Sequence, residues 1–147
     1  LLATGGTGTP NVSQLALEVQ TSRTTIMNYI KFLGDARSLN MLYRRGEGFP
    51  KKPVRLMMHN TNLMHVMTPG QVNRQDMIET FFQSATSPKH KVSVGDRSCT
   101  FILDDKYRFR ILDEIPKRRS TDVIYVSTDK KEGEGQEIPL WMFGLIY

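Results

Sequence analysis

The sequence predicts a mixed α+β fold in two parts, and three observations lead to this prediction. Two short amphipathic helical patterns follow one another closely near the N-terminus. A basic, glycine-containing segment with alternating apolar residues comes next. Beyond residue 72, one further helical pattern is followed only by strand-like segments and loops. Helices and strands that are segregated along a chain are typical of α+β proteins.

The composition is that of a folded protein without a membrane span. The chain has 147 residues, 39% of them hydrophobic, which suffices for one ordinary domain or two small ones. It has no apolar run of the ~18 residues that a membrane helix needs. The single cysteine, Cys99, rules out an internal disulfide and favours a cytoplasmic location. Because no signal peptide is visible and the first residue is not Met, we expect a fragment of a longer protein.

The positive charge is confined to the first part of the chain. Residues 1–58 contain eight Lys or Arg and three Asp or Glu, whereas residues 59–147 contain 12 of each kind. This asymmetry accounts for the whole net charge of +5. It indicates a polyanionic partner for the first part, and a merely solvated basic surface is the alternative.

The first two helical patterns have the spacing of a helix-turn-helix. Asn11 and Ser22 are candidate N-caps of the two helices, and only residues 20–22 separate them. Each pattern places its apolar side chains on one face, which we expect to be buried. These side chains are Val12, Leu15, Ala16 and Val19 in the first helix, and Ile26, Tyr29, Ile30 and Leu33 in the second.

Residues 41–58 predict a β-hairpin with a basic tip, in which Val54, Leu56 and Met58 alternate with Arg55 and Met57. A helix-turn-helix followed by a basic hairpin is the plan of a winged helix, and duplex DNA is its expected ligand. Docking on a neighbouring domain is the alternative. The predicted DNA-binding residues are Ser22, Arg23, Thr24, Thr25, Asn28, Lys31, Arg44, Arg45, Lys51 and Lys52.

A second domain is predicted after a junction within residues 59–72, so that the domains span 1–60 and 61–147. "RQDMIETFFQSAT" predicts a helix whose apolar face holds Met77, Ile78, Phe81 and Phe82. Strands are expected at residues 91–94, in a hairpin over 98–114, and in "DVIYVSTD". "KKEGEGQE" is expected to be a surface loop, and the apolar "IPLWMFGLIY" to dock on the domain.

The register of the 98–114 hairpin follows from burial. A three-residue loop, Asp104 to Lys106, pairs Leu103 with Tyr107, Phe101 with Phe109, and Cys99 with Ile111, which places these side chains on one apolar face. The opposite face then carries Thr100, Ile102, Arg108 and Arg110. A metal-dependent nuclease needs carboxylates there, and two guanidinium groups repel a divalent cation instead.

Other candidate sites have weaker patterns. The glycines of residues 1–10 lack the Gly-Lys dipeptide of a phosphate loop. His59, His65 and His90 are not at metal-ligand spacing, and paired Asp104 and Asp105 are typical of turns. Lys117 to Arg119 more often form a solvated surface than a phosphate site. We therefore expect no metal and no cofactor in this chain.

Several segments resemble the C-terminal region of a Bacteroidetes-type AAA-family ATPase, and the resemblance as a whole covers almost all of residues 9–147. The matching segments are "PNVSQLALEVQTSRTTIMNYIKFLGDA", "NTNLMHV", "IETFF", "HKV", "DDKYRF" and "IPLWMFGLIY". In that family an ATP-binding module precedes a winged helix and a small PD-(D/E)xK nuclease-like domain of the restriction-endonuclease-like α/β type. The resemblance implies that the full-length protein is an ATPase, whose phosphate loop lies outside these residues.

The same resemblance implies that the nuclease positions are degenerate. The family's Asp, Glu and Lys positions fall on Thr100, Arg110 and Glu114. We therefore expect a chain that is not an enzyme: a winged helix that binds duplex DNA, and a nuclease-like module that contacts partners such as its own ATPase module. One alternative is an active metal-dependent nuclease that uses Asp104, Asp105 and Glu114. Another is a regulatory tail that only docks on protein.

Overall fold

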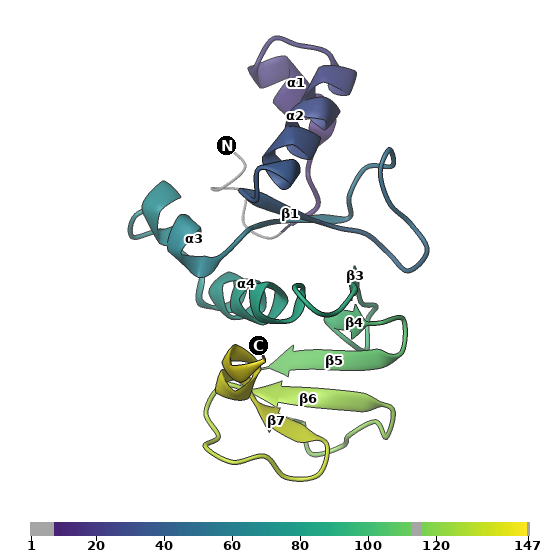
Figure 1. The fold of residues 1–147 in the computed structure, drawn as a ribbon, viewed down its shortest axis with the longest axis vertical. Helices are drawn as coiled ribbons and strands as arrows, with labels where there is room; N and C mark the ends of the chain where they lie inside the picture. Colours follow the sequence, from purple (N-terminus) through teal and green to yellow (C-terminus); the bar gives the residue numbers. More distant parts are fainter. Residues whose placement is uncertain (1–7, 113–115, 147) are drawn as a thin grey trace. The chain divides into compact units, whose positions relative to one another are not determined.

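The computed structural model describes residues 8–112 and 116–146 and has a mixed α+β fold, as predicted (Figure 1). Backbone contacts group the chain into two units, Leu1–Thr80 and Phe81–Tyr147. The division falls within helix α4, Arg74–Thr86. The domain boundary predicted near residue 60 stays a prediction, and each unit is described by itself.

The first unit begins with the two expected helices, α1 (Val12–Glu18) and α2 (Arg23–Asp35). Both predicted N-caps are confirmed. Asn11 Oδ1 accepts a hydrogen bond of 3.1 Å from the Gln14 N–H, and Ser22 Oγ accepts one of 3.0 Å from the Thr25 N–H. These bonds satisfy amide groups that have no partner within the first turn of a helix.

The two helices bury fewer apolar side chains than the sequence pattern indicates. One hydrophobic cluster of this unit consists of the buried residues Val12, Ala16, Ile26, Ile30 and Leu56. Three side chains expected in the core, Val19, Tyr29 and Leu33, are instead exposed. Val19 lies just past the end of α1, and Tyr29 and Leu33 flank the narrow stripe of α2 that Ile26 and Ile30 bury. The prediction for these three residues was wrong because a helical pattern identifies the apolar face of a helix but not how much of that face the neighbouring elements cover.

The predicted hairpin consists of β1 (Leu39–Leu42) and β2 (Arg55–Met58), which pair antiparallel with Leu39 opposite Met58. Residues 43–54 connect them and form what we call the basic loop. Leu56 and Met57 are both buried, so the expected alternation in β2 was wrong. A short helix that the sequence did not predict, α3 (Thr61–Met67), follows and is capped by the Asn60 side chain.

An ion pair lies in the interior of the first unit. The Arg55 guanidinium donates to Glu79 Oε2, and Gln75 Nε2 donates to Glu79 Oε1 at 2.8 Å. The side chains of Arg55 and Glu79 are only 18% and 10% exposed. Arg55, which contributes to the positive charge of the first part, is thus neutralised by a residue of α4 and joins β2 to that helix.

The second unit contains a five-stranded sheet in the order β3-β4-β5-β6-β7 (Figure 1). Its strands are β3 (Val92–Val94), β4 (Phe101–Leu103), β5 (Tyr107–Leu112), β6 (Val123–Ser127) and β7 (Glu137–Pro139). The first three strands form an antiparallel meander, whereas β6 and β7 run parallel to β5. The continuous apolar run of β6 is buried between its two neighbours, as its sequence predicts.

The hairpin register is confirmed in its central part. Phe101 pairs with Phe109 and Leu103 with Tyr107. The predicted pairing of Cys99 with Ile111 was wrong, because β4 begins only at Phe101. The Thr100 side chain accepts the Ile111 N–H instead, at 3.1 Å. Cys99 and Ile111 are nevertheless buried, whereas Tyr107 is 45% exposed because it lies beside the turn.

Four phenylalanine rings form the core of the second unit. Phe82 is fully buried in α4, and its ring lies 5.6 Å from Phe101, 5.2 Å from Phe109 and 4.7 Å from Phe143 between centroids. Phe143 belongs to the closing 3₁₀ helix, η1 (Leu140–Leu145). The expected docking of this segment therefore depends on Phe143, since Trp141 and Leu145 are more than half exposed.

A tight bend connects β3 to β4. The Gly95 N–H donates to the Thr100 carbonyl at 2.9 Å. A Cβ atom at Gly95 would lie 2.1 Å from the Cys99 carbonyl oxygen, which is far inside van der Waals contact. The bend therefore requires glycine because there is no room for a Cβ atom, and not because of its backbone angles.

Candidate nucleic-acid interface

The residues predicted to bind DNA lie on two elements of the first unit. Six of them begin or belong to α2, and four lie in the basic loop. Arg23, Thr24 and Asn28 are exposed on α2, and all four loop cations are exposed as well. The structure thus presents most of the predicted side chains to solvent, although several already have partners within the unit.

Several of the ten residues are engaged locally. The hydroxyl oxygens of Ser22 and Thr25 lie 2.8 Å apart, and the Ser22 oxygen caps α2. Lys31 pairs with Asp35 at 2.7 Å and Lys51 with Glu47 at 3.3 Å. Exposed ion pairs of this kind contribute at most about 1 kcal/mol, so a phosphate can compete for either lysine.

Three of the predicted DNA-binding cations carry charge that no ion pair of the described residues neutralises. Within residues 8–112 and 116–146, the side chains of Arg23, Arg44 and Lys52 form no ion pair. Arg23 lies at the start of α2, whereas Arg44 and Lys52 lie near the two ends of the basic loop. The start of α2 and the basic loop thus each present positive charge to solvent, and Arg23 and Lys52 line the same hollow.

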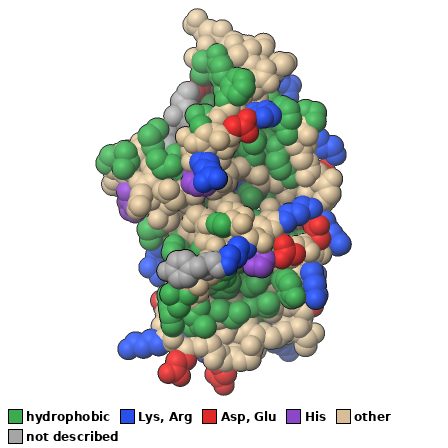
Figure 2. Space-filling model, viewed as in Figure 1, with side chains coloured by type: hydrophobic (Ala, Val, Ile, Leu, Met, Phe, Trp, Pro, Cys, Tyr) green, Lys and Arg blue, Asp and Glu red, His purple; other side chains and the backbone are tan. Residues whose placement is uncertain are grey.

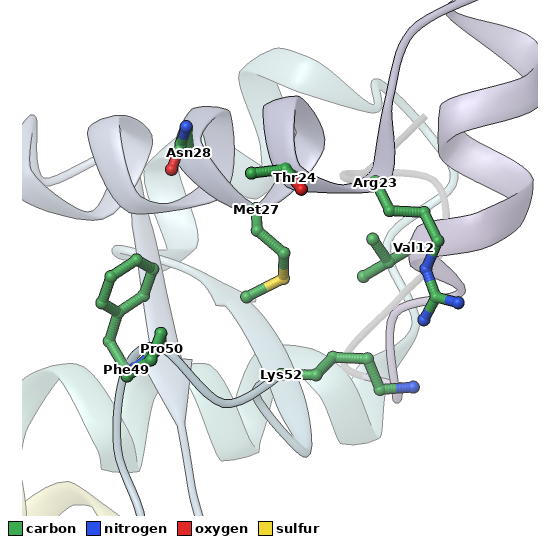
Figure 3. Close-up of a pocket in the computed structure, with 8 residues that line it drawn as sticks. All are labelled: Val12, Arg23, Thr24, Met27, Asn28, Phe49, Pro50 and Lys52. Atoms are coloured by element: carbon green, nitrogen blue, oxygen red, sulfur yellow. The ribbon is translucent and has the colours of Figure 1, made fainter.

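A hollow of about 380 Å³ separates α2 from the basic loop (Figure 3). Its lining combines cationic, polar and apolar side chains. They are Val12, Arg23, Thr24, Met27, Asn28, Phe49, Pro50 and Lys52. Four of these, Arg23, Thr24, Asn28 and Lys52, are predicted DNA-binding residues. The hollow therefore lies within the predicted interface.

The first unit also exposes apolar side chains, one of which lines the hollow. Phe49 of the basic loop is 43% exposed, and the Lys31 ammonium lies 5.8 Å from its ring centroid. Phe32 and Leu17 are 62% and 80% exposed, and Figure 2 shows hydrophobic side chains on the surface of this part of the chain. Sequence reasoning missed Phe49, because a single phenylalanine between glycine and proline is not distinguishable from a buried loop anchor.

Thr100 and Arg110, two of the residues predicted to be degenerate nuclease positions, lie on the face of the sheet opposite the phenylalanine core. Thr100 bonds to the backbone of β5, with its N–H donating to the Phe109 carbonyl at 2.7 Å. Arg110 is half-buried and has no hydrogen-bond partner among the described residues. Glu114 lies outside the described residues.

Carboxylates that the sequence argument did not place are found near this face. Arg108 lies between Asp96 and Asp122, at 3.0 Å from each, and also donates to the Ser98 hydroxyl. Hydrogen bonds from the Ser98 hydroxyl and N–H, together with the Arg108 charge, lower the pKa of Asp96 to about 2. A hydrogen bond from Ser120 lowers the pKa of Asp122. The charge of Arg108 is thus neutralised by these carboxylates. Of the two guanidinium groups expected to repel a divalent cation, only that of Arg110 therefore remains uncompensated among the described residues.

Glu137 is a second carboxylate that the sequence argument misplaced. It was expected in a surface loop, but it begins β7 and its side chain is only 1% exposed. Arg119 and Lys130 reach its Oε2 atom at 3.1 and 3.0 Å. The strand register places Arg110, Tyr125 and Glu137 in one row across β5, β6 and β7. Glu137 is thus a buried, ion-paired group that connects two loops to the sheet edge.

The turn aspartates have structural partners. Asp104 and Asp105 both have positive φ, as in a type I′ turn. Asp104 bonds to His90 Nδ1 at 2.7 Å and accepts the Lys91 N–H at 2.9 Å, which lowers the pKa of its carboxyl. Asp105 pairs with the Lys91 ammonium at 2.9 Å. These bonds fasten the turn to the start of β3.

Across residues 8–112 and 116–146, no cluster of three or more His, Cys, Asp or Glu side chains has the arrangement of a metal site. In the same residues, every helix is too short or too polar to cross a membrane. Compared with known proteins, the chain matches no family model, no curated protein and no solved structure.

Proposed function

We propose that the first part of the chain is a winged helix that binds duplex DNA with little sequence preference. Arg23, Arg44 and Lys52 support this proposal most directly, because these three predicted DNA-binding cations form no ion pair among the described residues. Thr24 and Asn28 lie beside them on the exposed side of α2 and have the chemistry to bond phosphates and base edges. In this arrangement α2 is the recognition helix and the basic loop is the wing.

Duplex binding should depend steeply on salt. If the interface neutralises about 4–5 phosphates, a plot of log K against log salt concentration should fall with a slope of about −4. Arg23→Ala and Lys52→Ala should each reduce the steepness by about one unit. Fluorescence anisotropy with a short labelled duplex measures the slope, and Arg97→Ala, an exposed cation of the second unit, is the matched control. No binding at low ionic strength, or a flat salt response, would favour the alternative of a protein-docking module.

We also propose that the second part is a degenerate nuclease-like module of a cytoplasmic AAA-type ATPase, with a role in binding its own ATPase module or other partners. Thr100 and Arg110 occupy the positions where the family pattern has carboxylates. Arg108 is held by Asp96 and Asp122, so these two carboxylates are engaged with a guanidinium. Metal-dependent cleavage requires carboxylates that hold the ion and activate water.

The purified chain should therefore leave nucleic acid intact. Supercoiled, linear and single-stranded DNA, and RNA, are incubated with the protein in Mg²⁺ and in Mn²⁺ and analysed on gels. The alternative is the active nuclease that uses Asp104, Asp105 and Glu114. It predicts metal-dependent cleavage that disappears in Asp104→Ala or Glu114→Ala. Cleavage that survives both substitutions would indicate a contaminating nuclease.

A further inference from the structure

The hollow between α2 and the basic loop has two chemically different ends. The Arg23 guanidinium and the Lys52 ammonium lie toward one side of it, together with Val12 (Figure 3). Phe49 and Pro50 lie at the other side. The Met27 side chain extends from α2 into the space between the two ends. The lining thus offers positive charge at one end and an aromatic ring at the other.

This polarity matches the chemistry of one nucleotide. A phosphate is recognised by arginine and lysine, whereas a base presents a flat apolar face with polar edges. Thr24 and Asn28 of α2 also line the hollow, and side chains of these types can bond such edges. Its volume of about 380 Å³ lies in the range of small-ligand pockets. The hollow is therefore of a size that suits a single nucleotide. A base within a continuous duplex is stacked on both faces and has no free face to place on Phe49.

Phe49 is accessible to a ligand in the hollow. The residue is 43% exposed, and the Lys31 ammonium lies 5.8 Å from its ring centroid. A lysine beside an aromatic ring can remain in place while a base stacks on the ring, and it then adds positive charge near the phosphate backbone. Among the apolar lining residues, Phe49 is therefore the one whose truncation should remove recognition of a base most selectively.

We propose that this hollow accepts one unpaired nucleotide, so that the first unit prefers duplex DNA with a single-stranded end to blunt duplex DNA. The proposal rests on the duplex-binding function proposed above. Arg23 and Lys52 hold the phosphate of the unpaired nucleotide, and its base stacks on Phe49 over the apolar floor formed by Met27 and Pro50. The neighbouring base pairs remain on the exposed side of α2.

The test compares two labelled duplexes of the same sequence by fluorescence anisotropy, one blunt and one with a short single-stranded overhang, each overhang polarity being tried. The full chain should bind one overhang probe about tenfold more tightly than the blunt probe, which is the usual scale of one base–aromatic stack. Phe49→Ala should bring the ratio of the two affinities close to one, and Phe49→Tyr should retain it. Phe32→Ala, an exposed phenylalanine of α2 outside the hollow, should also retain it.

The outcomes separate this inference from the function on which it rests. Equal affinity for blunt and overhang probes, with a steep salt dependence, would overturn the inference and leave duplex binding in place. A preference that persists in Phe49→Ala would overturn it too, because the base would then be read elsewhere. Failure to bind any probe at low salt would overturn both. Circular dichroism of each variant confirms that the helices remain folded.

Discussion

Replacing Phe82 with alanine should destabilise the second unit by about 3–5 kcal/mol. Its ring is fully buried and lies within 5.6 Å of three other phenylalanine rings, measured between centroids. The substitution removes this apolar surface from the core and leaves a cavity that the surrounding strands cannot close, because their register is fixed by the sheet.

Urea unfolding followed by tryptophan fluorescence measures this loss. The only tryptophan, Trp141, belongs to the second unit and therefore reports on it. Tyr107→Ala is the matched control, since Tyr107 is an aromatic residue of the same sheet that is 45% exposed, and it should cost about 1 kcal/mol or less. Equal losses in the two variants would show that the phenylalanine cluster does not form the core.

Replacing Arg55 with methionine should destabilise the first unit by about 3 kcal/mol or more, because it leaves the Glu79 carboxylate buried without its partner. The Glu79 side chain is 10% exposed, so solvent cannot compensate for the lost guanidinium. Replacing both residues, in Arg55→Met/Glu79→Met, should restore much of the stability, because neither charge then remains in the interior.

Thermal unfolding followed by far-UV circular dichroism measures this effect, since α1, α2 and α3 all belong to the first unit. Lys51→Met is the control, because its pair with Glu47 is exposed and should contribute well under 1 kcal/mol. If the double variant is as unstable as Arg55→Met alone, the buried charge of Glu79 is not the cause of the loss.

The elements that the sequence predicted are those with strong local signals. Asn11 and Ser22 fixed the starts of two helices because a capping side chain acts within one turn. The register at Phe101 and Phe109 followed from the requirement that one face be buried. Patterns of this kind determine local structure without contacts to distant residues. They also identified the helix and the loop, α2 and the basic loop, on which the predicted DNA-binding residues lie.

The features that the sequence did not predict depend on contacts between distant segments. The sequence around Glu137 predicts an acidic, glycine-rich surface loop, whereas the parallel pairing of β7 with β6 buries this residue. Asp96 and Asp122 meet at Arg108 because the sheet brings together residues from three separate segments. The hollow at Phe49 likewise depends on how the basic loop returns toward α2. No periodicity in the sequence encodes these juxtapositions.

The bend at Gly95 has a consequence for how this sequence can diverge. A Cβ atom at this position would meet the Cys99 carbonyl oxygen at 2.1 Å, whereas one at Gly46 or Gly135 would meet no atom within 4 Å. Gly46 and Gly135 are constrained by backbone angle alone, so asparagine or aspartate, which tolerate positive φ, can replace them at modest cost. Position 95 has no such substitute. In homologous chains that keep this β3–β4 connection, glycine at position 95 should therefore be an invariant marker by which remote members of the lineage can be aligned.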